Sequence, residues 1–116
     1  MLGNFVLSSG YYDAYFTKAQ KVRKLIKEAT EQMLKENDIL LFPTTPSTAF
    51  KIGEINDPIQ MYLQDIFTVH ANIVGMPAVS LPMGKHSNNL PFGVQLISNT
   101  FKEDLLYSAS QYILNM

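Results

Sequence analysis

The sequence contains no cysteine, and this absence excludes disulfide bonds and thiolate metal sites. Charge is also scarce, because nine Lys and Arg residues nearly balance ten Asp and Glu residues to give a formal net charge of −1. A near-neutral chain offers no electrostatic basis for whole-domain binding to nucleic acid. No apolar run approaches the roughly 18 residues of a membrane span, and the N-terminal MLGNFVLSSG lacks a signal-peptide pattern. We therefore expect a soluble, cytoplasmic protein without membrane contact.

What the chain does have is apolar residues, which occupy 47% of its 116 positions. That proportion is typical of a globular protein rather than a disordered one. A chain of this length is enough for one small domain, and it can bury well over half of the surface that its unfolded form exposes. We expect a single domain over residues 1–116, built around a hydrophobic core.

The most regular pattern lies in residues 11–36, where apolar side chains recur every three or four positions and predict an amphipathic helix. Ser8 or Ser9 can cap its start, and Asp13 suits the positive end of the helix dipole. The opposite face carries a basic cluster that could contact phosphates, although a solvated helix face is the favoured interpretation. The apolar face is expected to hold Tyr15, Ala19, Val22, Ile26, Ala29 and Met33, and the basic cluster consists of Lys18, Lys21, Arg23, Lys24 and Lys27.

Three short apolar runs predict strands at Ile39–Phe42, Ala78–Leu81 and Phe92–Ile97, with the turn-rich residues 84–89 between the last two. The dipeptide Asp57-Pro58 predicts a helix start, because Asp can cap and Pro suits the first helical position. The inward face of that helix is expected to hold Ile59, Tyr62, Leu63, Ile66 and Phe67.

Two further helices complete the expected pattern. A short helix is predicted from His70 to Val74, where Gly75 ends it, and a closing helix over residues 102–114. The order helix, strand, helix, helix, strand, strand, helix predicts an α/β fold, with α+β as the alternative. The inward face of the closing helix is expected to hold Leu105, Ala109, Tyr112 and Ile113.

A search for catalytic chemistry finds no nucleophile paired with a base. There is no G-x-S-x-G motif, and caps, turns and surface positions explain the serines better. His70 and His86 are far apart in the sequence, His86 lies in a turn, and His70 is more typical of a satisfied core residue than of a base. No metal-ligand spacing or Gly-rich nucleotide loop occurs. We expect no catalytic residue, no metal site and no cofactor in this chain.

Asp65 is the one unusual charge. It directly precedes Ile66 and Phe67, at the edge of an apolar helical face. A carboxylate buried there without a partner would cost free energy, so it must either reach water or hold a cationic group. From its spacing alone, exposure to water is the favoured interpretation.

Five stretches, read in order, resemble the last third of amidase-signature enzymes. The first and third of them are more similar to the A subunits of glutamyl-tRNA(Gln) amidotransferases than to general amidases, and together they cover almost the whole chain. The stretches are Leu7–Arg23, Phe42–Glu54, Asp57–Val69, Ala71–Gly84 and Leu90–Ser98.

This resemblance implies a mixed β-sheet flanked by helices and a Ser–Ser–Lys triad that hydrolyses amides. The triad lies upstream of the matched region, so the chain alone is expected to be inactive. In the amidotransferases, the A subunit releases ammonia from glutamine. A partner subunit, which would hold the ATP and magnesium, uses that ammonia to convert Glu-tRNA(Gln) to Gln-tRNA(Gln). The implied partners are the remainder of the A subunit itself and the other subunits, with tRNA contacted only through the complex.

The resemblance also gives Asp65 a role, because it matches the acidic residue that holds the α-amino group of glutamine. The Arg expected to hold the α-carboxylate would precede the position that matches Met1, and His70 replaces the Pro common at its position. Two alternatives stay open: another amidase acting on a small amide, and a non-catalytic interaction module.

The three predicted strands are few for the larger sheet that the resemblance implies, so open strand edges and apolar side chains should face water. Such surfaces associate. We therefore expect the isolated chain to be a homo-oligomer, most simply a two-fold dimer. The contact is expected to bury some of Tyr11, Tyr15, Phe67, Ile73 or Val79.

Overall fold

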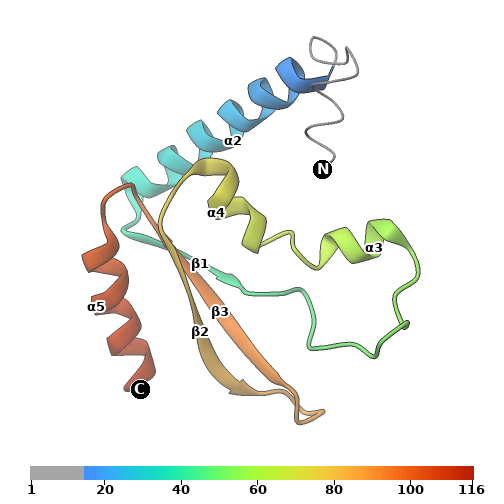
Figure 1. The fold of residues 1–116 in the computed structure, drawn as a ribbon. Helices are drawn as coiled ribbons and strands as arrows, with labels where there is room; N and C mark the ends of the chain where they lie inside the picture. The colour runs from blue at the N-terminus through green and yellow to red at the C-terminus, as the bar shows by residue number, and fades with distance from the viewer. Residues whose placement is uncertain (1–14) are drawn as a thin grey trace.

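A computed structural model describes residues 15–116 of the protein (Figure 1). Helices and strands follow one another in the predicted order, and the fold class is α/β. The predicted caps Ser8, Ser9 and Asp13 lie outside the described residues, as does the predicted start of the first helix. The elements are α2 (Thr17–Glu36), β1 (Ile39–Pro43), α3 (Pro58–Leu63), α4 (Thr68–Val74), β2 (Ala78–Lys85), β3 (Pro91–Ser98) and α5 (Glu103–Leu114).

The three strands form one sheet in the order β1-β3-β2, so β3 is its central strand. Leu96 of β3 lies opposite Leu41 of β1 and Val79 of β2, and both pairings are antiparallel. All three predicted strands are therefore confirmed. β2 runs four residues further than predicted, through a bulge between Pro82 and Gly84. Within residues 15–116 every strand pairing is antiparallel, so the parallel part of the expected mixed sheet is not in this region.

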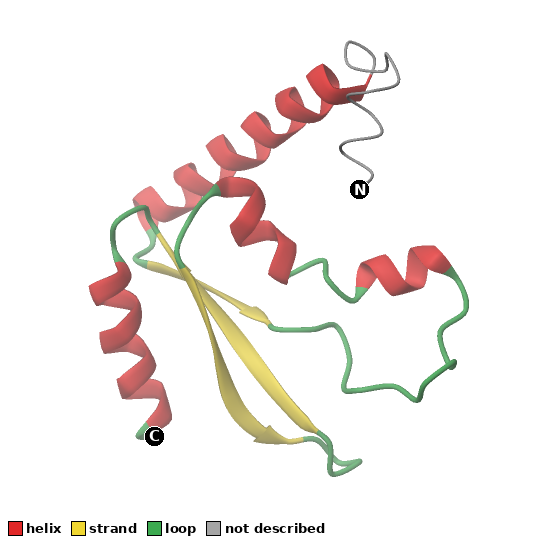
Figure 2. Cartoon of the chain, viewed as in Figure 1, coloured by secondary structure: helices red, strands yellow, loops and turns green. Residues whose placement is uncertain are grey.

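Helices cover both faces of the sheet (Figure 2). Because successive strand residues point to opposite faces, neighbouring residues of β3 enter different cores. Ile97 packs with Leu34 of α2 and Val74 of α4, while Leu96 packs with Leu106 of α5. Both residues are almost completely buried. The central strand thus holds the two helical layers together.

The inward faces of the two long helices differ in part from the prediction. In α2 the fully buried positions are Thr30 and Leu34, whereas Tyr15, Val22 and Met33 are exposed. The N-terminal half of α2, which carries Val22, extends beyond the sheet (Figure 1), whereas Met33 lies in the C-terminal half and is exposed all the same. In α5, Leu105, Ala109 and Ile113 are half-buried as expected. Tyr112 of α5 is exposed, while Leu106 and Ser110 are buried.

The predicted helix from Asp57 is shorter than expected. Asp57 caps it as predicted, because its Oδ1 accepts from the Ile59 N–H at 3.0 Å. The helix ends at Leu63, and the expected inward face is wrong because α3 buries no residue. Turns with hydrogen bonds to the third preceding carbonyl follow, for example Asp65 N to Tyr62 O at 3.1 Å. The following helix ends as predicted at Gly75, which adopts φ 67°.

Candidate functional site

Asp65 lies in the turn that joins α3 to α4, and its side chain is exposed. The main chain around it is well ordered by hydrogen bonds, since its carbonyl accepts from Val69 N at 2.9 Å and from Thr68 Oγ1 at 3.2 Å. Within residues 15–116 the carboxylate itself takes part in no hydrogen bond or ion pair. The exposure of Asp65 to water is what the favoured interpretation of its spacing predicted.

Two anchors fix the turn on either side of Asp65. On one side, Ser47 Oγ donates to Gln64 Oε1 at 3.1 Å. On the other side, the nearly buried Gln95 of β3 donates from Nε2 to the Phe67 carbonyl at 2.9 Å. The Phe67 ring also stacks on Phe42 of β1, with ring centroids 6.2 Å apart. The contacts of Phe67 with Gln95 and Phe42 thus tie the turn that carries Asp65 to the sheet.

His70 of α4 helps to lock this region to α2. Its Nε2 lies 3.0 Å from Thr30 Oγ1, and the same hydroxyl donates to Ile26 O at 2.8 Å. A hydroxyl has one proton, so the hydrogen bond to His70 requires His70 Nε2–H to donate. The ring also lies against Phe42, with centroids 5.9 Å apart. This geometry agrees with the prediction that His70 is a satisfied core residue rather than a base.

Two hollows flank the segment that carries Asp65. An apolar cavity of about 280 Å³ is lined by Met33, Phe42, Ile66, Phe67 and His70. A more polar cavity of about 390 Å³ lies between residues 43–48 and the end of the β2–β3 hairpin, with Ser47 and His86 in its wall. Because Ser47 also holds Gln64, the polar hollow and the Asp65 turn are directly linked.

The other polar residues agree with their structural interpretations. His86 is exposed, and the basic face of α2 is solvated, with Lys24 and Glu28 forming an i,i+4 pair at 3.7 Å. Arg23 departs from this pattern, because its Nε donates to Ile73 O at 2.8 Å and ties α2 to α4. In the region that the structure describes, no group of three or more His, Cys, Asp or Glu side chains could hold a metal ion.

Thr30 and Gln95 are the residues that sequence reasoning missed. Both are polar side chains that lie inside apolar periodic segments, and that placement is the signal that could have identified them.

None of the helices within residues 15–116 has both the length and the apolar character that a membrane span requires.

Comparison with known proteins matches residues 1–107 to the family described as Amidase. The chain is 59% identical over 103 residues to the A subunit of glutamyl-tRNA(Gln) amidotransferase of Halothermothrix orenii, covering 89% of this chain and 22% of that protein. It is 55% identical over 111 residues to the same subunit of Trichodesmium erythraeum, covering 95% and 23%. The chain thus spans less than a quarter of the length of these relatives.

Solved structures of related proteins also match this chain. The crystal structure of the A subunit of glutamyl-tRNA(Gln) amidotransferase from Thermotoga maritima matches with a TM-score of 0.76 and 55% identity, covering 88% of this chain and 22% of that one. A 6-aminohexanoate cyclic dimer hydrolase matches less completely, with a TM-score of 0.51 and 35% identity over 60% of this chain and 17% of its own.

Proposed function

The chain belongs to the amidase family, and we propose that it is the C-terminal part of the A subunit of a glutamyl-tRNA(Gln) amidotransferase. The observation that carries this proposal is the 59% identity over 103 residues to such a subunit. Identity to the cyclic amide hydrolase is 35% over a smaller share of the chain. Residues 1–116 then act as one unit of a longer enzyme that releases ammonia from glutamine.

In this proposal the chain supplies substrate binding and not amide cleavage. The Ser–Ser–Lys triad belongs to the remainder of the A subunit, and without a nucleophile and its base the chain alone releases no ammonia. The other subunits of the complex bind ATP, magnesium and the tRNA. The near-neutral charge of this chain supports an indirect role in tRNA binding.

Asp65 is the proposed substrate-binding residue. Its exposed carboxylate lies on a turn that is anchored at Gln64 and Phe67, and it suits a charge-assisted hydrogen bond to the α-ammonium group of glutamine. Such a bond orients the substrate so that its side-chain amide points toward the catalytic part of the enzyme. A carboxylate on a fixed turn does this without the entropy loss of ordering a mobile loop.

The test is Asp65→Asn in the intact amidotransferase, which removes the charge and keeps the shape. Losing one charge-assisted bond should weaken glutamine binding by about 1.5–3 kcal/mol. Glutamine-dependent formation of Gln-tRNA(Gln) should then fall, while formation supported by added ammonia stays unchanged. Asp38→Asn is the matched control, because Asp38 is also exposed but lies between α2 and β1. Unchanged glutamine use in the Asp65→Asn enzyme contradicts the assignment.

The second candidate is another amidase of the family, acting on a different small amide. The likeness to the cyclic dimer hydrolase favours it over a non-catalytic module. A panel of amides given to the intact enzyme decides between the two candidates. Hydrolysis of a non-amino-acid amide, with none of glutamine, would establish this second function instead.

A further inference from the structure

Gln95 is a polar side chain at the centre of the sheet, where an apolar side chain would be easier to bury. It lies on β3, the central strand, and is 5% exposed. An amide that leaves water costs free energy unless it is hydrogen-bonded, whereas a methionine of similar length has no such cost. The stability of the sheet alone does not account for an amide here, so its hydrogen-bond partner is the guide to its role.

That partner is the main chain at the start of α4. Gln95 Nε2 donates to the Phe67 carbonyl at 2.9 Å, and Phe67 is the N-cap residue of α4. The Phe67 side chain makes no capping hydrogen bond, so other contacts hold the start of this helix. Alternation along β3 puts Gln95 on the same face of the sheet as Ile97, which packs against α2 and α4. The central strand therefore reaches the start of α4 directly.

Asp65 belongs to the same hydrogen-bonded unit as the start of α4. Its carbonyl accepts from Val69 N at 2.9 Å and from Thr68 Oγ1 at 3.2 Å, and both donors lie in the first turn of α4. A displacement of Phe67 is therefore passed on to the main chain of Asp65, two positions away.

We propose that Gln95 is a positioning residue for glutamine binding, and that it acts through Asp65. This inference rests on the proposed function, in which the Asp65 carboxylate holds the α-ammonium group of glutamine. A binding group must be held within about 0.5 Å of its productive position, so displacing the main chain that carries Asp65 weakens the bond. The second anchor, from Ser47 to Gln64, is exposed to water, which competes for both side chains.

The test is Gln95→Met in the intact amidotransferase that contains this chain. Methionine keeps the length of the side chain but has no N–H group, so the bond to the Phe67 carbonyl is lost while the site stays filled. The KM for glutamine should rise about three- to tenfold, the factor that one neutral hydrogen bond contributes. The kcat with glutamine and the activity with added ammonia should each change by less than about twofold, because the proposed role is in substrate binding alone.

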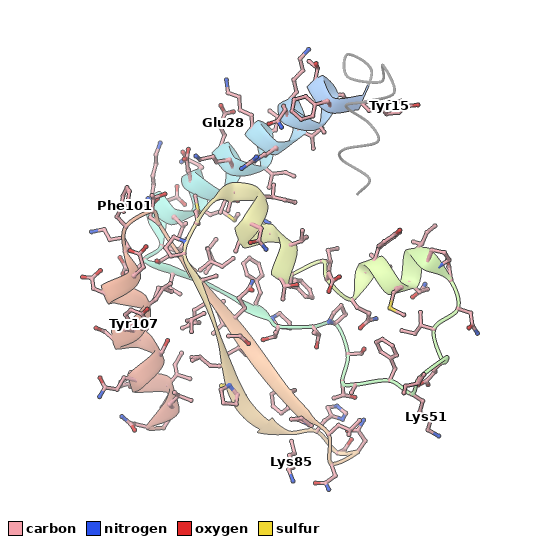
Figure 3. The ribbon with its side chains drawn as sticks, in the orientation of Figure 1. Tyr15, Glu28, Lys51, Lys85, Phe101 and Tyr107 are labelled. Atoms are coloured by element: carbon pink, nitrogen blue, oxygen red, sulfur yellow. The ribbon has the colours of Figure 1, made fainter. Side chains whose placement is uncertain are left out.

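Ser98→Ala is the matched control. Ser98 is a buried polar residue of the same strand, and its Oγ donates at 3.1 Å to the carbonyl of Lys102, the N-cap residue of α5. It contacts the start of α5 as Gln95 contacts the start of α4, but from the other face of the sheet. Figure 3 shows that Phe101, at the start of α5, lies far from Lys51, in the loop that leads to α3. Ser98→Ala should lower stability and leave the KM for glutamine unchanged.

A double-variant cycle separates a positioning role from a merely structural one. If Gln95 acts through Asp65, adding Gln95→Met to the Asp65→Asn enzyme should raise the KM for glutamine by less than about twofold further. An equal rise in both backgrounds overturns the proposal, because the two residues then act independently. So does an unchanged KM in Gln95→Met when Asp65→Asn raises it. An unchanged KM in both single variants overturns the Asp65 assignment as well, which distinguishes the two failures.

Hydrogen exchange gives a second measurement that needs no turnover. In the Gln95→Met enzyme the Val69 amide, which bonds to the Asp65 carbonyl, should exchange at least about threefold faster, and Ser98→Ala should leave its exchange unchanged. Exchange equal to that of the parent enzyme contradicts the proposal. If Gln95→Met impairs folding, Gln95→Asn keeps the amide and shortens its reach by one methylene group. The Gln95→Asn enzyme should also show a raised KM for glutamine, and a KM equal to the parent's refutes the inference.

Discussion

Thr30 is the point at which a single substitution best tests the packing of α2 against α4. Thr30→Val keeps the shape of this fully buried side chain and removes its hydroxyl. The hydroxyl donates to Ile26 O at 2.8 Å and lies 3.0 Å from His70 Nε2. The Ile26 carbonyl still accepts the main-chain bond of the helix, whereas His70 Nε2–H loses its acceptor inside the protein.

An unsatisfied buried polar group costs about 1–3 kcal/mol. For a domain close to this size, each 1 kcal/mol lowers Tm by roughly 4–8 °C. Thr30→Val should therefore lower the melting temperature by roughly 8–16 °C, since a cost of about 2 kcal/mol, near the middle of the range, is expected for a half-buried histidine. Valine has nearly the same shape and volume as threonine, so no cavity adds to the loss.

Thermal unfolding followed by circular dichroism measures the shift in melting temperature, and urea denaturation measures the change in the free energy of unfolding. Ser108→Ala is the control, because the Ser108 hydroxyl makes the same bond to the fourth preceding carbonyl, at 3.0 Å, on an exposed helix face. Its cost should stay within about 0.5 kcal/mol. Combining Thr30→Val with His70→Phe removes both partners and should recover part of the loss. The reasoning fails if Thr30→Val costs no more than Ser108→Ala.

Three further predictions follow from the same structure. Gly93→Ala should destabilise the sheet by about 1–3 kcal/mol, because its Cβ would lie 2.7 Å from the Leu81 carbonyl oxygen; an unchanged urea midpoint would contradict this close approach. The purified 116-residue chain should release no ammonia from glutamine, asparagine or simple amides, and turnover abolished by a Ser substitution within it would refute the proposal. The isolated chain should self-associate at low micromolar concentration as judged by light scattering, and a monomer that binds no hydrophobic dye would contradict this.

The sequence predicts the elements of this fold well, because local rules determine them. The three strands, the Asp57 cap and the stop at Gly75 each follow from side-chain chemistry within a few residues. Inward faces are harder to predict, because periodicity identifies an apolar face and not what covers it. Val22 of α2 and Tyr62 of α3 fit helical apolar faces, but they are 46% and 76% exposed.

At the site, too, local features could be predicted from the sequence, whereas contacts between distant residues could not. The exposure of Asp65 could be predicted from its spacing, but its anchors could not. The bond from Gln95 to the Phe67 carbonyl joins residues that are 28 positions apart, and the bond from Ser47 to Gln64 spans 17 positions. The sheet register places Gln95 opposite Phe42, and Phe67 contacts both of these residues.

The central position of β3 has a consequence for the order in which the protein folds. Within residues 15–116, β3 is the last strand along the chain, and β1 and β2 each pair only with it. During synthesis, β1 leaves the ribosome about 50 residues before β3, so its partner within this region follows late. The β2–β3 hairpin is local and closes first, whereas joining β1 to it closes a long loop and is the slower step. Until then α2 is the element of this region that precedes β1 and can cover its apolar residues.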